Sequence, residues 1–317
     1  MKVLVTELMW DDGMKELKRS GCSVDYDMEL GRKRKELLAL APAYDALIVR
    51  NETKVDAELL DVAKNAKVIG RLGVGLDNID LGAASSRNIP VITAKHANAT
   101  SVAEYVMASM LDAYRPLHHA DADVRRGNWN RKFFTGNELN GKTLGLVGMG
   151  EIAHRVARRA NAFGMETIGY DPFVTPFDHI LAETGVRSVN TLDELLVASD
   201  FVSVHVPLTK ETRHMINKKN FPHMKPHAYV INAARGGIIH EGDLIEAVQS
   251  GEIAGAYLDV LEAEPIPKDS PLTQIASIRL TPHIAGATNA AQSRTAMLIA
   301  EEVMKVLNGG QSLCAVV

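Results

Sequence analysis

The sequence contains little cysteine. Its two cysteines, Cys22 and Cys314, are far apart among 317 residues and do not have the spacing of metal ligands. This count excludes a disulfide scaffold and fits a reducing compartment. No apolar run reaches the length of a membrane span, and the N-terminal MKVLVTELMWDDG turns acidic too early for a signal peptide. We therefore expect a cytoplasmic protein with no membrane contact and no metal site.

The sequence also lacks an excess of either charge. It has 35 lysines and arginines against 39 aspartates and glutamates, a formal net charge of −4. A balance of this kind does not predict a surface that binds polyanions, so we expect no nucleic-acid partner. The densest basic run, GRKRKE at 31–36, is interpreted as the solvated start of a helix.

Short apolar runs alternate with longer amphipathic runs along the chain. In the first hundred residues the pattern predicts strands near 2–7, 23–27, 45–50, 67–73 and 90–94, with helices near 11–21, 32–41 and 56–66. A second series predicts strands near 142–150, 166–171, 201–206, 228–234, 253–260 and 277–282. Alternation of strand and helix indicates parallel sheets covered by helices, so the fold class is α/β with two domains.

A long helix is expected between the two series. Ser101 and Glu104 fit the S-x-x-E capping box, and Pro116 should kink the helix or end a segment of it. The last segment, 289–310, has the pattern of an amphipathic helix stopped by glycines.

The stretch LGLVGMGEIA contains a glycine pattern of the G-x-G-x-x-A type. Gly148 permits a tight turn, Gly150 lets a pyrophosphate approach the backbone, and Ala153 lets helix and strand pack closely. The next predicted strand ends in Asp171, whose carboxylate can bind both ribose hydroxyls and would repel a 2′-phosphate. The pattern predicts a dinucleotide site that prefers NAD over NADP.

Three charged or titratable residues follow the ends of later strands. Arg235 ends the run INAAR, Glu264 lies in LEAEPIP, and His283 lies in TPHIAG. Ligands of open parallel sheets bind at the carboxyl ends of strands, so all three can face the nicotinamide. Taken singly, each also has an ordinary interpretation: a surface ion pair, a loop acid before proline, or a loop histidine.

These motifs resemble the NAD-dependent D-2-hydroxyacid dehydrogenase family. The resemblance rests on LGLVGMGEIAHRVA, on NAARGGIIHEGDLIEAVQSGEIAGAYLDVLEAEPIPKDSPL and on TPHIAGAT. The segments VIGRLGVGLDNIDLGAA and GNELNGKTLG are most similar to D-3-phosphoglycerate dehydrogenases. The family usually has a third glycine where this chain has Ala153.

The resemblance implies two doubly wound parallel-sheet domains. Residues 1–98 with 290–317 would form a discontinuous, flavodoxin-like substrate domain, and residues 99–289 a Rossmann NAD-binding domain. It also implies that the protein transfers a hydride between NAD and C2 of a small, doubly anionic 2-hydroxy acid such as 3-phosphoglycerate. His283 would be the general acid and base, Glu264 would orient its imidazole, and Arg235 would hold the substrate carboxylate and polarise the carbonyl oxygen.

Further positions follow from the resemblance residue by residue. Contacts with the cofactor are implied for Gly148, Gly150, Glu151, Ile152, Asp171, Val206, Pro207, Ala233, Asp259 and Gly286. Contacts with the substrate are implied for Arg50, Arg71, Val74, Gly75 and Arg235. Arg131 matches a residue that can reach the neighbouring subunit's site, and the family dimerises through its nucleotide domain, so a homodimer is expected.

Several alternatives stay open at this point. RNET at 50–53 replaces the family's common RSAT and places Glu52 near the anion pocket. A sulfonate such as sulfolactate, or a simpler 2-hydroxy or 2-keto acid, would also suit the arginines. The given sequence ends without the regulatory domains of many phosphoglycerate dehydrogenases, so serine feedback through them is not expected. A different class is a dinucleotide-sensing binding protein on the same fold, as in the C-terminal-binding-protein corepressors.

Overall fold

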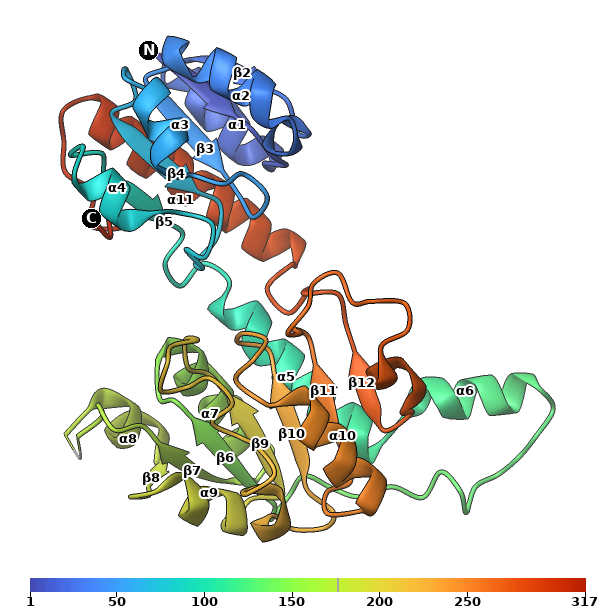
Figure 1. Ribbon diagram of the computed structural model, residues 1–317. Coiled ribbons are helices and arrows are strands. Elements are labelled where there is room, and N and C mark those ends of the chain that lie inside the picture. Colours follow the sequence, from blue (N-terminus) through green and yellow to red (C-terminus); the bar gives the residue numbers. More distant parts are fainter. Residues whose placement is uncertain (176) are drawn as a thin grey trace. The chain divides into compact units, whose positions relative to one another are not determined.

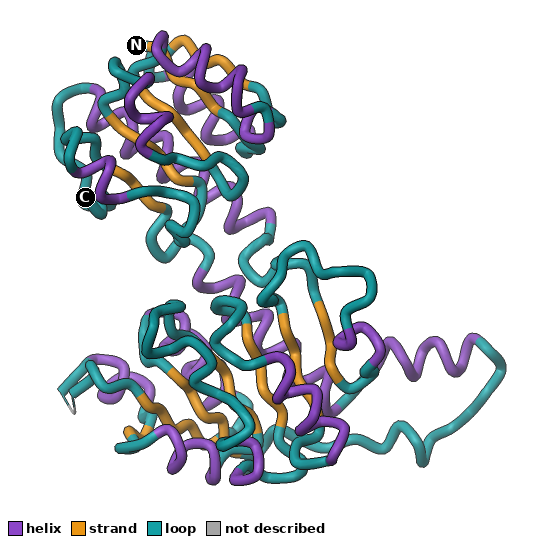
Figure 2. The backbone as a smooth tube through the Cα atoms, in the orientation of Figure 1, coloured by secondary structure: helices purple, strands orange, loops and turns teal. Residues whose placement is uncertain are grey.

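The computed structural model describes residues 1–175 and 177–317 and divides them into two domains. The first domain consists of Met1–Asn98 and Ala287–Val317, and the second of Ala99–Gly286. From the sequence we placed these boundaries at 98/99 and 289/290. Figure 1 shows the course of the chain, and in Figure 2 the strands of each domain form one layer between helices.

The first domain is a five-stranded parallel sheet with the order β2-β1-β3-β4-β5, which is the flavodoxin-like order. Helices α1 and α11 pack together on one face, where a Cβ at Gly13 would lie 2.4 Å from the Ala296 carbonyl oxygen. The chain thus returns to this domain to complete its core. Its elements are β1 (Lys2–Val5), α1 (Asp11–Arg19), β2 (Ser23–Tyr26), η1 (Leu30–Arg32), α2 (Arg34–Leu40), η2 (Ala41–Ala43), β3 (Ala46–Val49), α3 (Ala57–Val62), β4 (Val68–Arg71), α4 (Leu81–Ser85), β5 (Val91–Thr93) and α11 (Asn289–Leu307).

The second domain is a seven-stranded parallel sheet with the order β12-β11-β10-β9-β6-β7-β8. This is the doubly wound Rossmann order with one further strand, and the strand order reverses between β6 and β9. Its elements are α5 (Ala99–Tyr114), α6 (Leu117–Arg125), β6 (Thr143–Val147), α7 (Glu151–Ala162), β7 (Glu166–Tyr170), α8 (His179–Thr184), β8 (Arg187–Ser188), α9 (Leu192–Ala198), β9 (Phe201–Val204), η3 (Phe221–His223), β10 (Tyr229–Asn232), α10 (Glu241–Ser250), β11 (Gly255–Leu258), η4 (Pro271–Gln274) and β12 (Ile278–Leu280).

The predicted fold class is confirmed, and two local predictions need correction. The capping box at Ser101 and Glu104 is wrong, because α5 already begins at Ala99 and Ser101 is buried inside its first turn. The short strand β8 and helix α4 were missed, because two and five residues are too few to show a period. Pro116 does end a helical segment, since α5 stops at Tyr114 and α6 starts after the proline.

Helix α6 and the segment after it project away from the sheet of the second domain (Figure 1). The buried Asp123 carboxylate accepts hydrogen bonds from the side-chain amides of Asn128 and Asn130 and so holds the turn that follows the helix. No helix in the described part of the chain is both long and apolar enough to cross a lipid bilayer.

Candidate active site

The glycine loop lies where the strand order of the second domain reverses. Gly148 directly follows β6 and has a φ of +89°, and a Cβ there would lie 2.7 Å from Val206 Cγ1 and 2.9 Å from the His205 carbonyl oxygen. Both the backbone conformation and the close contact therefore require glycine. Val206 and Pro207 follow β9, so the loop after that strand lies directly against the glycine loop.

Gly150 is the N-cap residue of α7, and a Cβ there would meet no atom within 4 Å. Open space in front of a helix N-terminus, with Glu151 and Ile152 in its first turn, suits a bound pyrophosphate. Ala153 is fully buried one turn into the helix, where a small residue lets α7 pack against the sheet. The residues at this end of the sheet therefore fit a dinucleotide.

Asp171 follows β7 and lies beside the glycine loop. Its Oδ2 accepts a hydrogen bond from the Met149 backbone N–H at 2.9 Å, and its Oδ1 accepts one from the Phe173 N–H at 2.9 Å. Each carboxylate oxygen keeps a further lone pair for a ribose hydroxyl. A negative charge at this position would repel a 2′-phosphate, and the resulting preference for NAD over NADP stays a prediction.

His283 and Glu264 form a direct pair. The Nδ1 atom of His283 lies 2.8 Å from Glu264 Oε2, while Glu264 Oε1 accepts a hydrogen bond from the Leu261 backbone N–H at 2.9 Å. Both side chains are partly exposed, with 48% and 39% of their surfaces accessible. The carboxylate fixes the ring orientation through Nδ1, so Nε2 is the nitrogen left to exchange a proton.

The loop that carries His283 is organised by Asp259, which follows β11. The Asp259 carboxylate accepts the backbone N–H groups of Ile284 and Ala285, each at 2.7 Å, and the Thr281 hydroxyl at 2.6 Å. Asp259 is only 1% exposed. These contacts make it a brace of the 281–285 loop, and its contact with the nicotinamide carboxamide stays a prediction.

A second brace comes from helix α5. The Tyr105 hydroxyl lies 2.7 Å from the Thr281 hydroxyl and so links this helix to the loop before His283. His283 itself has a φ of +56°, an uncommon conformation for a residue with a side chain. The surrounding hydrogen bonds hold it there, and Gly286 ends the loop and the domain.

Arg235 lies on the loop after β10, beyond Ala233. Its backbone carbonyl accepts a hydrogen bond from Asn232 Nδ2 at 2.9 Å, and its guanidinium Nη1 donates to the Ala234 carbonyl at 2.6 Å. The next residue, Gly236, packs against the loop of Glu264, because a Cβ there would lie 1.9 Å from the Leu261 carbonyl oxygen. The structure thus brings the arginine loop and the glutamate loop into contact.

Arg50 of the first domain follows β3 and forms part of a built loop. Glu7, which is 4% exposed, accepts the backbone N–H groups of residues 50, 51, 52 and 53 at 2.8–2.9 Å. Burial alone would raise the pKa of the Glu7 carboxyl, but these hydrogen bonds hold that pKa below its ordinary value. Sequence reasoning missed Glu7, because a lone acid after a strand has no distinguishing pattern.

Arg71, at the end of β4, is 8% exposed. Its Nη1 donates to the Leu72 carbonyl at 2.9 Å and its Nη2 to Asn51 Oδ1 at 2.8 Å. A Cβ at Gly73 would lie 1.7 Å from Nη1, so the Gly73 backbone lies directly against the guanidinium. Arg71 therefore supports the loop of Val74 and Gly75, and its contact with substrate stays a prediction.

The basic run at 31–36 is engaged in ion pairs. Arg32 contacts Glu29 and Glu52, Lys33 contacts Asp27, and Arg34 contacts Asp56 and Glu58. Pairing of this kind neutralises the run within the first domain, which agrees with our interpretation of a solvated surface segment.

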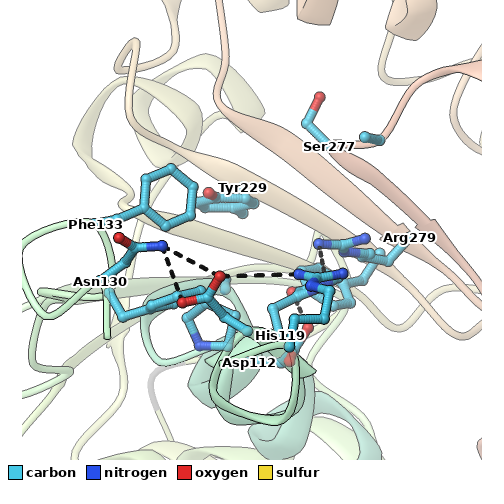
Figure 3. Close-up of a pocket in the computed structure, with 14 residues that line it drawn as sticks. Asp112, His119, Asn130, Phe133, Tyr229, Ser277 and Arg279 are labelled. Carbon is cyan, nitrogen blue, oxygen red and sulfur yellow. Dashed lines mark hydrogen bonds and ion pairs between the residues drawn. The ribbon is translucent and has the colours of Figure 1, made fainter. Parts of the chain in front are cut away.

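A cavity in the second domain lies elsewhere. It has a volume of about 800 Å³ and contains none of the predicted site residues (Figure 3). Side chains of α5, α6, the segment after α6, β10 and β12 face it, and Arg279 Nη2 lies 2.8 Å from His119 Nε2. Phe133, 81% exposed, stands beside Tyr229 in this view. Among the described residues no cluster of three His, Cys, Asp or Glu side chains could hold a metal ion.

Comparison with known proteins places these features in a family. Residues 107–285 match the model of the D-isomer specific 2-hydroxyacid dehydrogenase, NAD binding domain. The chain is 44% identical to a D-3-phosphoglycerate dehydrogenase of Archaeoglobus fulgidus over 98% of its own length and 58% of that protein. It is 41% identical to an (S)-sulfolactate dehydrogenase of Chromohalobacter salexigens over 96% of its length and 98% of that protein.

Solved structures agree with this placement. The protein TT0316 of Thermus thermophilus superposes with a TM-score of 0.91 at 35% identity, with both chains fully covered. The chain spans about three fifths of the length of the D-3-phosphoglycerate dehydrogenases that it matches. The family model covers more than half of the chain, and the glycine loop and the Glu264–His283 pair lie within it. The chain belongs to the D-isomer specific 2-hydroxyacid dehydrogenase family, and its second domain is the NAD-binding domain.

Proposed function

We propose that this chain transfers a hydride between NAD and C2 of a small, doubly anionic 2-hydroxy acid similar to 3-phosphoglycerate. The observation that carries the proposal is the 2.8 Å contact between His283 Nδ1 and Glu264 Oε2, in the domain that also holds the glycine loop. A dinucleotide-binding domain requires neither residue for binding alone. A carboxylate-oriented imidazole at a strand end supplies the proton transfer that hydride chemistry needs.

The bound nicotinamide supplies the hydride acceptor in one direction and the hydride donor in the other. His283 handles the proton. With Nδ1 held by Glu264, neutral Nε2 takes the hydroxyl proton of the substrate during oxidation, and the imidazolium returns it during reduction. The Glu264 carboxylate stabilises the imidazolium that forms, and the Leu261 N–H fixes that carboxylate in turn.

Arg235 binds the substrate carboxylate and polarises the oxygen on C2. Its planar guanidinium can donate two parallel hydrogen bonds to a carboxylate and can stabilise negative charge on a carbonyl oxygen. Gly236 packs against the Leu261 carbonyl, so a displacement of the Arg235 loop would press on the loop of Glu264. Substrate binding at Arg235 can therefore influence the group that orients His283.

In the first domain Arg50 supplies the cation for the second anionic group of the substrate. The Gly73 N–H already donates to the Arg71 carbonyl at 2.8 Å, so the backbone N–H groups of Val74 and Gly75 are the ones that serve the substrate carboxylate. The names of two relatives suggest two candidate acids, 3-phosphoglycerate and sulfolactate, whose phosphate and sulfonate groups both suit a guanidinium. A substrate with one carboxylate would leave Arg50 without an anion.

The test is a steady-state comparison of three keto acids, in which turnover is followed as the loss of NADH absorbance. We expect kcat/KM to be highest with 3-phosphohydroxypyruvate or sulfopyruvate and at least about tenfold lower with pyruvate, because a charge-assisted hydrogen bond is lost. Equal kcat/KM values for all three would contradict the doubly anionic substrate. NADH binding without turnover of any acid would favour the dinucleotide sensor.

The second domain also supports a homodimer. The segment from α6 to residue 137 exposes large apolar side chains beside the 800 Å³ cavity, whose floor includes Tyr229 and Tyr257. These exposed side chains are Leu117, Val124, Trp129 and Phe133. One chain thus presents both a projecting apolar segment and an aromatic cavity, a combination that suits a twofold pair of copies. Arg131 lies in the projecting segment, so in such a pair it would contact the partner subunit.

Sedimentation of the wild-type protein and of Phe133→Ser tests the dimer. We expect a dimer for the wild type and a weakened one for the variant, because Phe133 is 81% exposed and its replacement leaves the core intact. A monomeric wild type would refute the proposal.

The two cysteines of the chain, Cys22 and Cys314, are free thiols. This agrees with our proposal that the protein acts in a reducing compartment, the cytoplasm.

A further inference from the structure

A second, smaller cavity lies in the first domain. Its volume is about 270 Å³, and it is lined by residues after β1, by residues after β3 and by the 28–32 segment. The strand order β2-β1-β3 reverses direction between β1 and β3, which is where open parallel sheets bind ligands. Three side chains on its wall decide its chemistry: Arg50, Glu52 and Arg32.

Arg50 is the cation that this cavity offers. Its guanidinium carbon lies 6.0 Å from the centre of the Trp10 ring, and no carboxylate of the described residues lies within ion-pair distance of it. Burial lowers the pKa of Arg50, although a guanidinium stays charged at neutral pH. The acid behind it, Glu7, uses its carboxylate on the backbone of residues 50–53.

Glu52 lines the same cavity two residues further along, and its carboxylate is a possible internal partner for Arg50. In the structure Glu52 pairs with a different residue. Glu52 Oε1 lies 2.5 Å from Arg32 Nη2, and Arg32 Nη1 lies 3.2 Å from Glu29 Oε2. The Arg32 guanidinium thus pairs with both Glu29 and Glu52, two acids that line this cavity.

We propose that Arg32 is a positioning residue for substrate selection: it holds Glu52 away from Arg50 and thereby leaves Arg50 to bind the second anionic group of the substrate. The inference deepens the proposed function and rests on it, because only the proposed function identifies the anion at Arg50 as part of the substrate. The effect of Arg32 on Glu52 does not depend on that identification. Without Arg32, the Glu52 carboxylate becomes an internal competitor for any phosphate or sulfonate at Arg50.

Inorganic phosphate is the probe, because its binding can be measured without turnover. The chain has two tryptophans, Trp10 and Trp129, so Trp129→Phe leaves the ring beside Arg50 as the only indole. In this background we compare four proteins: the parent, Arg32→Gln, Glu52→Gln and the double variant. Phosphate is titrated against Trp10 fluorescence at constant ionic strength, and Arg34→Gln is the matched charge control because Arg34 pairs with Asp56 and Glu58.

We expect Arg32→Gln to weaken phosphate binding by up to about fivefold, the effect of losing Arg50 to one partly exposed ion pair. Glu52→Gln should change little alone but restore binding to within about twofold in the double variant, and this non-additivity is the signature of positioning. Arg34→Gln should change binding by less than about twofold. With 3-phosphohydroxypyruvate the same pattern should appear in KM, with kcat unchanged and the KM for pyruvate unaffected.

Three results would overturn the inference. A double variant as weak as Arg32→Gln would show that Arg32 itself binds the anion. An equal gain from Glu52→Gln with and without Arg32 would show that net charge alone matters. If phosphate does not change the Trp10 fluorescence of the parent protein, Arg50 is not available to bind the anion. Failure of the proposed function looks different: the phosphate pattern holds, but no doubly anionic keto acid is reduced.

Discussion

Replacing Gly236 by alanine tests whether the loops of Arg235 and Glu264 act as one unit. A Cβ at residue 236 would lie 1.9 Å from the Leu261 carbonyl oxygen, 2.2 Å from the Leu261 carbonyl carbon and 2.8 Å from the Glu262 nitrogen. All three atoms belong to the backbone, so no side-chain rotation can relieve the contact. One of the two loops must move.

The size of that movement follows from the contact. Non-bonded heavy atoms prefer separations of roughly 3.5 Å, so the loops must part by about 1.5 Å. The 261–264 loop carries Glu264, which lies 2.8 Å from His283 Nδ1, and so the movement reaches the general base. A misplacement of about 1 Å costs on the order of 100-fold in rate. Overpacking should also cost about 1–3 kcal/mol of stability.

The assay is kcat for keto-acid reduction, measured with the affinity for NADH and the thermal midpoint. Gly237→Ala is the matched control, because residue 237 has a φ of +78° but its nearest neighbours are side-chain atoms at 3.5 Å or more. We expect a similar loss of stability, about 1–2 kcal/mol, with less than about tenfold loss of kcat. A folded Gly236→Ala enzyme with a kcat within about threefold of the wild type would refute the linkage.

Three further predictions concern the second domain. His283→Gln should lower kcat by about 10²–10⁴-fold while NADH binding is retained, and turnover near the wild-type rate would remove His283 from proton transfer. Asp171→Ala should reduce the NAD preference at least about tenfold, measured as the ratio of kcat/KM values for NADH and NADPH. Burial lowers the pKa of His205 to about 4 from 6.5, so the unfolded chain binds the extra proton between these values and stability falls as pH falls through them. His205→Leu should remove about 3 kcal/mol of this dependence in denaturation measured at pH 7 and pH 4, and an unchanged slope would contradict it.

Much of the second domain could be predicted from periodicity and local chemistry. An apolar run, a glycine turn and an amphipathic helix each constrain only neighbouring residues, so Gly148, Gly150 and Asp171 could be identified as one motif. His283 and Glu264 needed one further rule, that parallel strands end at the same edge of a sheet. The two residues lie 19 positions apart in the chain. The sequence could predict that both follow strand ends, but it could not predict their 2.8 Å contact.

What could not be predicted depends on contacts between distant segments. The sequence around Arg235 does not reveal that the backbone at Gly236 lies against the Leu261 carbonyl oxygen, 25 residues further along. Glu52 looked like a negative charge in an anion pocket, and only the fold shows that Arg32 neutralises it. Asp259 was expected to contact the cofactor, and only the fold shows that its carboxylate also accepts hydrogen bonds from residues 281, 284 and 285. Pair chemistry of this kind has no local signal.

Glu7 is a buried acid whose carboxylate holds the loop that carries Arg50. A carboxylate can accept all four backbone N–H groups of residues 50–53, but the amide of Glu7→Gln would turn its NH₂ group toward two of these donors. We expect a loss of about 3 kcal/mol and a higher KM for doubly anionic acids, because leaving donors unpaired is costly. Urea denaturation and steady-state kinetics measure the two effects.

The pH dependence separates this role from simple packing. The folded pKa of Glu7 lies below the ordinary 4.5, so its contribution is present above pH 4.5 and is lost as the pH falls through the folded value. Glu7→Gln should therefore be much less stable than the wild type at pH 7, with the difference shrinking in acid. Glu36→Gln, the same change at an exposed site of α2, should match the wild type throughout. A constant difference between Glu7→Gln and the wild type across this range would mean that the charge of Glu7 does not hold the Arg50 loop.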